Sequence, residues 1–325
     1  MINDKYTNLN DGIYCIDARY ICTGNACCYL IVEDNEIAII ETGTVFTVEG
    51  IEEALHHLSL NKEMVRYIIP THVHLDHAGG AGVLMQKYTN AQLVIHPRGA
   101  KHMINPDKLV AGSKAVYGEK KFRELYGEVV PVPEYRMLTM QDRDKIYLKK
   151  RILEFRHTPG HAEHHFCIWD QVSQGWFSGD TFGISYEKLG GKQNRFIFPT
   201  TSPVQFDPDK LLGSIDLIMK YKPKQIFLTH FSVIKEPAKQ AKILREQIES
   251  YRKIAIELRF SSNREKKIFN AIKVMTISNI VSKLPCCDIK KVENLLELDF
   301  KLNAQGIDIW ISKQNEKNKK ISTGK

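Results

Sequence analysis

Residues 71–80 read THVHLDHAGG and place three histidines and one aspartate, all potential metal ligands, within six positions. Neutral imidazole and charged carboxylate are donors that borderline divalent metals such as zinc prefer. In extended backbone His72 and His74 point to the same side, because side chains alternate with a period of two. Asp76 and His77 can then turn toward a second metal as a helix begins. The segment therefore predicts the centre of a metal site that follows a buried strand.

Three later segments each carry a potential ligand where a predicted strand ends. His161 follows a Pro-Gly turn in HTPGH, Asp180 lies in SGDT, and His230 ends LTH. Sites in α/β proteins lie where strands stop and loops begin, so we expect these side chains to lie close together. The predicted metal ligands are His72, His74, Asp76, His77, His161, Asp180 and His230.

Short β-rich runs alternate with helical patterns over the first 250 residues, and hairpins also occur, which predicts mixed sheets. We expect strands near residues 28–32, 36–41, 66–70, 93–96, 145–148, 153–157, 165–169, 176–178 and 225–229. We expect helices over residues 48–58, 79–88 and 208–221. After residue 237, long helical patterns over 239–259, 265–283 and 290–302 precede a strand-like run at 307–311. The pattern predicts an α+β protein with a domain over 1–236 and a helical C-terminal subdomain over 237–325.

The ordered series HxHxDH, His, Asp and His resembles the metallo-β-lactamase superfamily over residues about 13 to 232. The resemblance implies a four-layer αβ/βα sandwich, with residues 1–236 as the catalytic domain and a dinuclear site at one edge. By the same resemblance, one metal is held by His72, His74 and His161, the other by Asp76, His77 and His230, and Asp180 bridges the two. The expected cofactors are two divalent ions, with zinc the first choice and iron or manganese the alternatives.

One residue departs from the family pattern. Where relatives usually carry Asp-Thr-Gly at a strand end, this chain has Glu41-Thr42-Gly43. By resemblance, that acid is a hydrogen-bond partner of the metal-binding histidines. Glutamate is longer by one methylene but can still accept an imidazole N–H, so we expect an altered site that still binds metal.

Comparison of the ligand set with those of known members of the superfamily narrows the range of expected activities. Classical β-lactamases of this fold lack the bridging aspartate, and flavodiiron reductases carry Glu where His74 stands. The HTPGH and SGDT segments look most like glyoxalase-II-type thioesterases and lactonases, although the glutathione-binding signature is absent. We therefore expect a hydrolase that attacks a small ester, thioester or lactone with a hydroxide bridging the metals. Asp76 and Asp180 are the predicted catalytic residues.

Three other activities compete with this interpretation. A persulfide dioxygenase would have the same ligands but bind a single iron through fewer of them. A two-metal nuclease is favoured only by the basic C-terminal part, where residues 251–325 carry 16 Lys and Arg against 8 Asp and Glu. Residues 1–250 balance at 30 basic and 30 acidic groups, so nucleic acid is not the expected partner. The third alternative is a non-catalytic relative.

Sequence gives weaker indications about the substrate. Arg98, His102 and Tyr117 lie in the insert between predicted strands, and Thr200 and Phe206 lie in a proline-punctuated loop. Loops of this kind cover the site in the superfamily, so these five residues are the predicted substrate contacts.

The amino-acid composition indicates the general class of protein and its expected location. The chain has 325 residues, of which 43% are hydrophobic and 26% charged, as in ordinary globular proteins. It shows no secretory signal and no membrane-length apolar run, so we expect a cytoplasmic protein with a small-molecule substrate and no membrane partner. Seven cysteines without framework spacing predict free thiols. The C-terminal helices are expected to pack on the sandwich or to form a homodimer contact.

Overall fold

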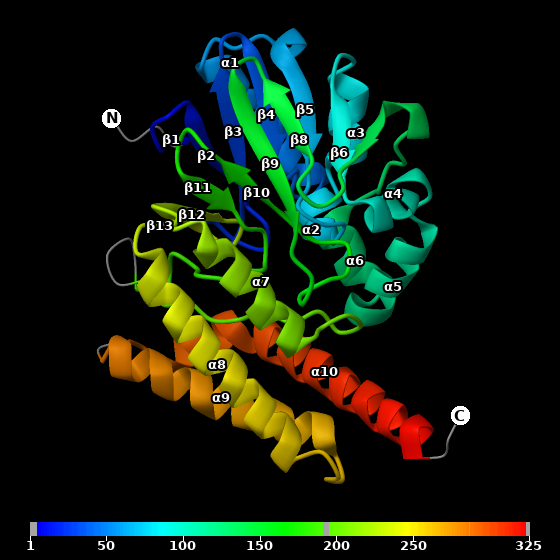
Figure 1. Ribbon diagram of the computed structural model, residues 1–325, viewed down its shortest axis with the longest axis vertical. Helices are drawn as coiled ribbons and strands as arrows, with labels where there is room; N and C mark the ends of the chain where they lie inside the picture. The colour runs from blue at the N-terminus through cyan, green and yellow to red at the C-terminus, as the bar shows by residue number, and fades with distance from the viewer. Residues whose placement is uncertain (1–4, 191–194, 286, 323–325) are drawn as a thin grey trace. The chain divides into compact units, whose positions relative to one another are not determined.

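The computed structural model (Figure 1) describes residues 5–190, 195–285 and 287–322. The chain divides into two compact units. The first unit comprises Met1–His157, His164–Gly179 and Lys222–Lys235. The second unit comprises Thr158–Glu163, Asp180–Tyr221 and Glu236–Lys325. Because the units are built from interleaved segments, a domain boundary at residue 236 stays a prediction.

The first unit contains two sheets, and both are mixed as predicted. The first sheet runs in the order β1 (Thr7–Asn8), β2 (Ile13–Asp17), β3 (Cys27–Glu33), β4 (Glu36–Ile40), β5 (Val65–Ile69), β6 (Gln92–Ile95) and β7 (Met137–Thr139). Strands β1 to β4 pair antiparallel, and β4 to β7 pair parallel. The second sheet runs β13 (Ser232–Ile234), β12 (Gln225–Leu228), β11 (Gly175–Phe177), β10 (Phe166–Asp170), β9 (Arg151–His157) and β8 (Lys145–Leu148). Its strands pair antiparallel except β11 with β12.

Two hydrophobic cores explain why the strands of the first sheet are apolar on both faces. Along β3, Tyr29 and Ile31 pack with residues of the second sheet such as Phe166 and Phe227. Leu30, which lies between them, points to the other core. Side chains alternate across a strand, so a sheet covered on both faces gives near-continuous apolar runs. Burying each large apolar side chain contributes roughly 1.5–3 kcal/mol.

Helices of the first unit contribute to the core on the other face of the first sheet. They are α1 (Val48–His57), α2 (Leu75–Ala78), α3 (Ala81–Lys87), α4 (Pro97–Ile104), α5 (Asp107–Tyr117) and α6 (Glu119–Tyr126), with 3-10 turns η1 (Val45–Thr47), η2 (Lys62–Met64) and η3 (Glu134–Arg136). Helix α1 buries Ile51 and Leu55, which the sequence pattern had placed on one face. The described cysteines are free thiols, and Cys286 lies outside the described residues.

The second unit is helical apart from its loops, and one prediction there is wrong. Its helices are α7 (Pro208–Lys220), α8 (Pro237–Glu257), α9 (Arg264–Lys283) and α10 (Ile289–Ser322). Helix α10 runs through the predicted strand at 307–311. Phe300, Ala304, Ile307 and Ile311 are all buried, and their spacing of four, three and four is that of one helix face. Among the described residues, no helix is both long enough and apolar enough to cross a membrane.

Candidate metal centre

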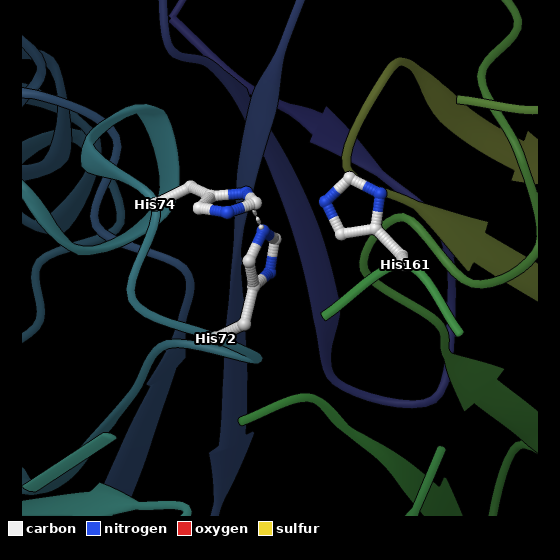
Figure 2. Close-up of side chains that lie close together, drawn as sticks. All are labelled: His72, His74 and His161. Atoms are coloured by element: carbon white, nitrogen blue, oxygen red, sulfur yellow. Dashed lines mark hydrogen bonds between the residues drawn. The ribbon is translucent and has the colours of Figure 1, made fainter. Parts of the chain in front are cut away.

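The HxH pair leads directly from a strand into a helix. Strand β5 ends at Ile69, and helix α2 begins at Leu75, immediately after His74. His72 is fully buried, and its Nε2 lies 2.8 Å from Nδ1 of His74 (Figure 2). The two rings meet edge to face with centroids 4.4 Å apart. The alternating backbone therefore brings the two imidazoles together, as the spacing predicts.

Asp76, His77 and His230 converge on a second point of the first unit. Each offers a ligand atom, and these atoms lie within 4.8 Å of one another. Oδ2 of Asp76 lies 3.7 Å from Nε2 of His77 and 3.4 Å from Nε2 of His230. His77 and His230 are both buried, whereas the Asp76 side chain is 20% exposed. A carboxylate and two imidazoles in this arrangement form a donor set that suits a divalent metal.

Hydrogen bonds at Nδ1 fix the ring orientation and the tautomer of His77 and His230. Nδ1 of His77 lies 2.9 Å from Oε1 of Glu41, and Nδ1 of His230 lies 3.0 Å from the carbonyl oxygen of Asn25. Both partners are acceptors, so the proton of each neutral ring belongs on Nδ1. The lone pair is then on Nε2, the atom that faces Asp76. This is the tautomer that a metal-binding histidine requires, and the arrangement therefore fits a metal ion.

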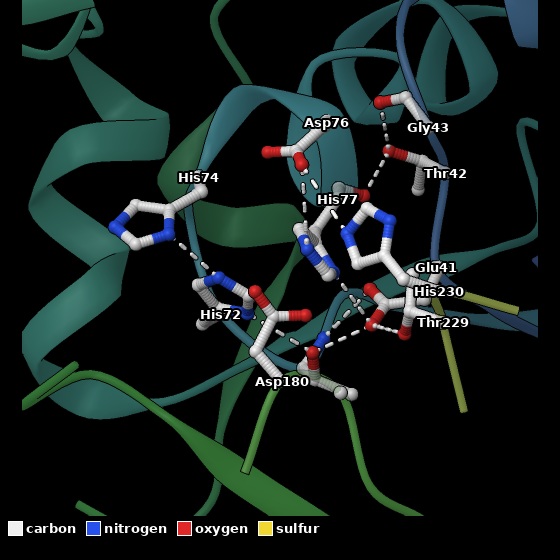
Figure 3. Close-up of polar contacts among 12 residues, drawn as sticks. Glu41, Thr42, Gly43, His72, His74, Asp76, His77, Asp180, Thr229 and His230 are labelled. Carbon is white, nitrogen blue, oxygen red and sulfur yellow. Dashed lines mark hydrogen bonds and ion pairs between the residues drawn. The ribbon is translucent and has the colours of Figure 1, made fainter. Parts of the chain in front are cut away.

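Glu41 connects several of these groups (Figure 3). It is 1% exposed, and its Oε1 accepts hydrogen bonds from the hydroxyls of Thr71 at 2.6 Å and Thr229 at 2.9 Å, as well as from His77. Its Oε2 accepts from the Thr71 amide at 3.0 Å. The expectation that the longer acid can still reach an imidazole N–H is confirmed by this contact.

Thr71 extends the influence of Glu41 to His72. The Thr71 hydroxyl has one proton, which it gives to Glu41, so its oxygen accepts from the ring nitrogen of His72 at 3.1 Å. This places the proton of His72 on Nδ1 and its lone pair on Nε2. Glu41 therefore orients His77 directly and His72 through one hydroxyl.

We expect Glu41→Gln to weaken metal binding about 10- to 100-fold, because an amide nitrogen would face donors instead of accepting from them. The affinity for zinc is measured by competition with a chromophoric chelator. Glu36→Gln is the matched control, since Glu36 is half-buried on the surface beside Arg66 and Lys149. Equal zinc affinity of the two variants would contradict the role given to Glu41.

His161 and Asp180 lie in the second unit and repeat the same arrangement. Nδ1 of His161 lies 3.3 Å from the carbonyl oxygen of Thr200, and its Nε2 lies 3.3 Å from Oδ2 of Asp180. Both side chains are almost completely buried. The turn before His161 requires glycine, because Gly160 has φ 129° and a Cβ there would lie 2.3 Å from the backbone nitrogen of Leu211.

Three predicted substrate contacts lie on α4 and α5 of the first unit. Arg98 is exposed, and its amide donates to Nδ1 of His96 at 3.1 Å. His102 is half-buried, and burial together with the nearby Lys101 and Lys108 charges lowers its pKa. Tyr117 ends α5 and is half-buried.

The other two predicted contacts lie in the second unit. Thr200 meets His161 through its main-chain carbonyl rather than its hydroxyl. Phe206 is 4% exposed, and its amide donates to the carbonyl of Ser202 at 3.3 Å.

Sequence reasoning did not assign roles to Asn25, Thr71 and Thr229. Asn25 and Thr71 each contact a predicted ligand, through a carbonyl and a hydroxyl respectively, whereas the Thr229 hydroxyl donates to Glu41. Thr71 and Thr229 directly precede His72 and His230, so their positions beside ligands were a usable signal. Asn25 lies 205 residues from His230, and no local pattern marks it.

The fold and these clusters agree with a family match. The model of the metallo-β-lactamase superfamily matches residues 23–230, and the chain belongs to this superfamily of metal-dependent hydrolases. Both the predicted family and the predicted sandwich fold with a C-terminal helical extension are thereby confirmed.

Individual relatives are distant. The chain is 26% identical over 212 residues to a metallo-β-lactamase fold-containing protein, ST1585, of Sulfurisphaera tokodaii, covering 62% of this chain and 76% of that one. It is 27% identical over 196 residues to human acyl-coenzyme A thioesterase MBLAC2, covering 54% and 65%. The solved structure of TTHA1429 from Thermus thermophilus matches with a TM-score of 0.61 at 20% identity, covering 78% and 85% of the two chains. At that identity the likeness supports the fold alone.

Proposed function

We propose that the protein is a hydrolase that uses two divalent metal ions, zinc first, on a small ester, thioester or lactone. The observation that carries the proposal is the repeated ligand arrangement: His77, His230 and His161 are each held at Nδ1 by an acceptor, and each turns Nε2 toward a carboxylate. Nothing in packing requires such inward-facing polar groups, because burying them without partners is costly.

The ligands divide between two ions in the proposal. His72, His74 and His161 would hold one ion, Asp76, His77 and His230 the other, and Asp180 both. When bound, the ions would activate a water molecule near neutral pH and polarise the scissile carbonyl. The carboxylates of Asp76 and Asp180 supply the negative charge that retains the cations, and Glu41 keeps His72 and His77 in the binding tautomer.

Relatives support the choice of substrate class. One is named an acyl-coenzyme A thioesterase, and another, from Pelagibacter ubique and 27% identical over 126 residues, is named a hydroxyacylglutathione hydrolase. Thioesters therefore come first in a substrate panel of acetyl-coenzyme A, octanoyl-coenzyme A, p-nitrophenyl acetate and simple lactones. A small-molecule substrate and a cytoplasmic setting complete the proposal.

Elemental analysis of the full chain, purified without added metal or chelator, tests the proposal first. We expect about two zinc atoms per chain and hydrolysis of a panel member that is lost on chelation and restored by zinc. His72→Ala should lose metal, whereas His56→Ala, an exposed histidine on α1, should keep it. One iron per chain with oxygen consumption on a persulfide would favour the dioxygenase instead. A chain without bound metal would favour a non-catalytic relative.

A further inference from the structure

His230 lies at the centre of a short hairpin loop in the first unit. Strands β12 and β13 pair antiparallel with Leu228 opposite Ser232, so residues 229–231 form the whole connection between them. Ser232 has φ 60°, a left-handed backbone conformation that residues other than glycine adopt infrequently. The direction in which Nε2 of His230 points therefore depends on contacts that hold this loop in place.

Residues at and just before the start of β3 supply these contacts. The amide of Cys27 donates to the carbonyl oxygen of Thr229 at 2.8 Å. The hydroxyl of Tyr29 donates to the carbonyl oxygen of Leu228. The carbonyl oxygen of Asn25 accepts the Nδ1 proton of the ligand itself at 3.0 Å. A segment about 200 positions earlier in the chain thus holds both the loop and the imidazole ring that it carries.

The thiol of Cys27 bridges the two ends of the hairpin loop. Its Sγ donates to the carbonyl oxygen of Leu228 at 3.3 Å and accepts from the amide of Ser232, also at 3.3 Å. A thiol can make both bonds because its S–H is a weak donor and its sulfur a weak acceptor. Cys27 is completely buried, so solvent does not compete for either bond. Alanine at this position would remove both of them.

We infer that Cys27 is a positioning residue of the metal centre, whose thiol fixes the hairpin loop so that Nε2 of His230 faces the ion. The inference rests on the two-ion centre of the proposed function, and it concerns one ion alone. The donors assigned to that ion, Asp76, His77 and His230, all belong to the first unit, as does Cys27. Cys27 acts through the main chain on either side of the ligand, and among the described residues it belongs to none of the three-ligand groups.

Zinc titration of the full-length protein against a chromophoric chelator tests the inference. We expect Cys27→Ala to weaken the binding of one zinc ion about tenfold and to leave the other ion unchanged, as for the loss of a group that orients a ligand. Cys27→Ser keeps one donor and one acceptor and should retain most of the affinity. Cys28→Ala is the matched control, because Cys28 is the next residue of β3, is also completely buried, and packs in the core on the other face of the sheet.

Amide hydrogen exchange of the metal-free protein gives a second measurement that does not depend on zinc. The Ser232 amide should exchange about tenfold faster in Cys27→Ala than in the wild-type protein, and at the wild-type rate in Cys28→Ala, because only Cys27 accepts from it. If the wild-type protein binds no zinc, the proposed function fails on its own account. The exchange rates then decide whether Cys27 holds the loop.

Four results would overturn the inference. The first two are an equal weakening of both zinc ions in Cys27→Ala and an equal loss of zinc affinity in Cys28→Ala. The third is a Cys27→Ser protein that binds zinc no better than Cys27→Ala, since the two hydrogen bonds would then not be the cause. The fourth is an unchanged exchange rate of the Ser232 amide in Cys27→Ala.

Discussion

Replacing Asp180 by asparagine is expected to lower turnover by about 100- to 1,000-fold, the size of effect that follows when one fixed electrostatic group is removed from an active site. The Asp180 residue is 5% exposed, and its Oδ2 lies 3.3 Å from Nε2 of His161. A buried carboxylate is costly unless a cation or donors compensate it. Asparagine keeps the shape and removes the charge, so under the proposed function it can no longer hold both ions.

The experiment compares kcat and zinc content of Asp180→Asn with those of Asp207→Asn. Asp207 belongs to the same unit and caps helix α7 by accepting from the amides of Asp209 and Lys210. Asparagine is an equally good cap, so this control loses the same charge without losing its structural role. Near-normal turnover in Asp180→Asn would exclude the two-metal scheme, and so would an equal loss in Asp207→Asn.

The local part of the site could be predicted from the sequence because it is encoded in one continuous segment. His72 to His77 follow a buried strand and enter a helix, and alternation followed by helical turn fixes where each side chain points. The same reasoning placed His161, Asp180 and His230 at strand ends. Whether all seven residues form one centre stays a prediction that metal analysis tests.

Long-range partners could not be predicted in this way. Glu41 meets Thr229 across 188 positions, and Tyr20 meets Tyr126 across 106. Such contacts depend on how the sheets and the inserted helices pack, and the hydrophobic periodicity of the sequence does not predict that packing. Helices α4 to α6 were left unassigned for the same reason, since their short segments alternate with loops.

The strand predicted at residues 307–311 shows how a short pattern misleads. Ile307, Ile309 and Ile311 alternate with polar or amphipathic residues, which is typical of a strand. Over a longer window, Ile307 and Ile311 continue the buried face that begins at Phe300. The intervening Asp308 faces Arg264 of α9, with its carboxylate 2.6 Å from the guanidinium Nε. Packing between α9 and α10 therefore explains why residues 307–311 form a helix and not a strand.

A second large effect is expected on stability, from the buried ion pair of Arg151 and Asp170 that joins β9 and β10. Both side chains are completely buried, and Nε of Arg151 donates to Oδ1 of Asp170 at 2.9 Å. The same guanidinium donates to the carbonyl oxygen of Asp11 at 2.5 Å, which ties the turn before β2 to the second sheet. Arg151→Met should therefore lower the free energy of unfolding by about 3–5 kcal/mol, because it leaves a charge buried without its partner.

Denaturant unfolding measures this loss, and two further variants show its origin. Arg245→Met breaks a surface pair with Asp216, whose side chain is 59% exposed, and should cost less than about 1 kcal/mol. Adding Asp170→Asn to Arg151→Met removes the stranded charge and should restore part of the stability, since Ser173 can still hydrogen-bond at that position. If Arg151→Met lowered the free energy of unfolding no more than Arg245→Met does, the buried ion pair would stabilise the protein no more than an exposed pair. If the double variant were less stable than Arg151→Met, the loss would come from missing packing rather than from a buried charge.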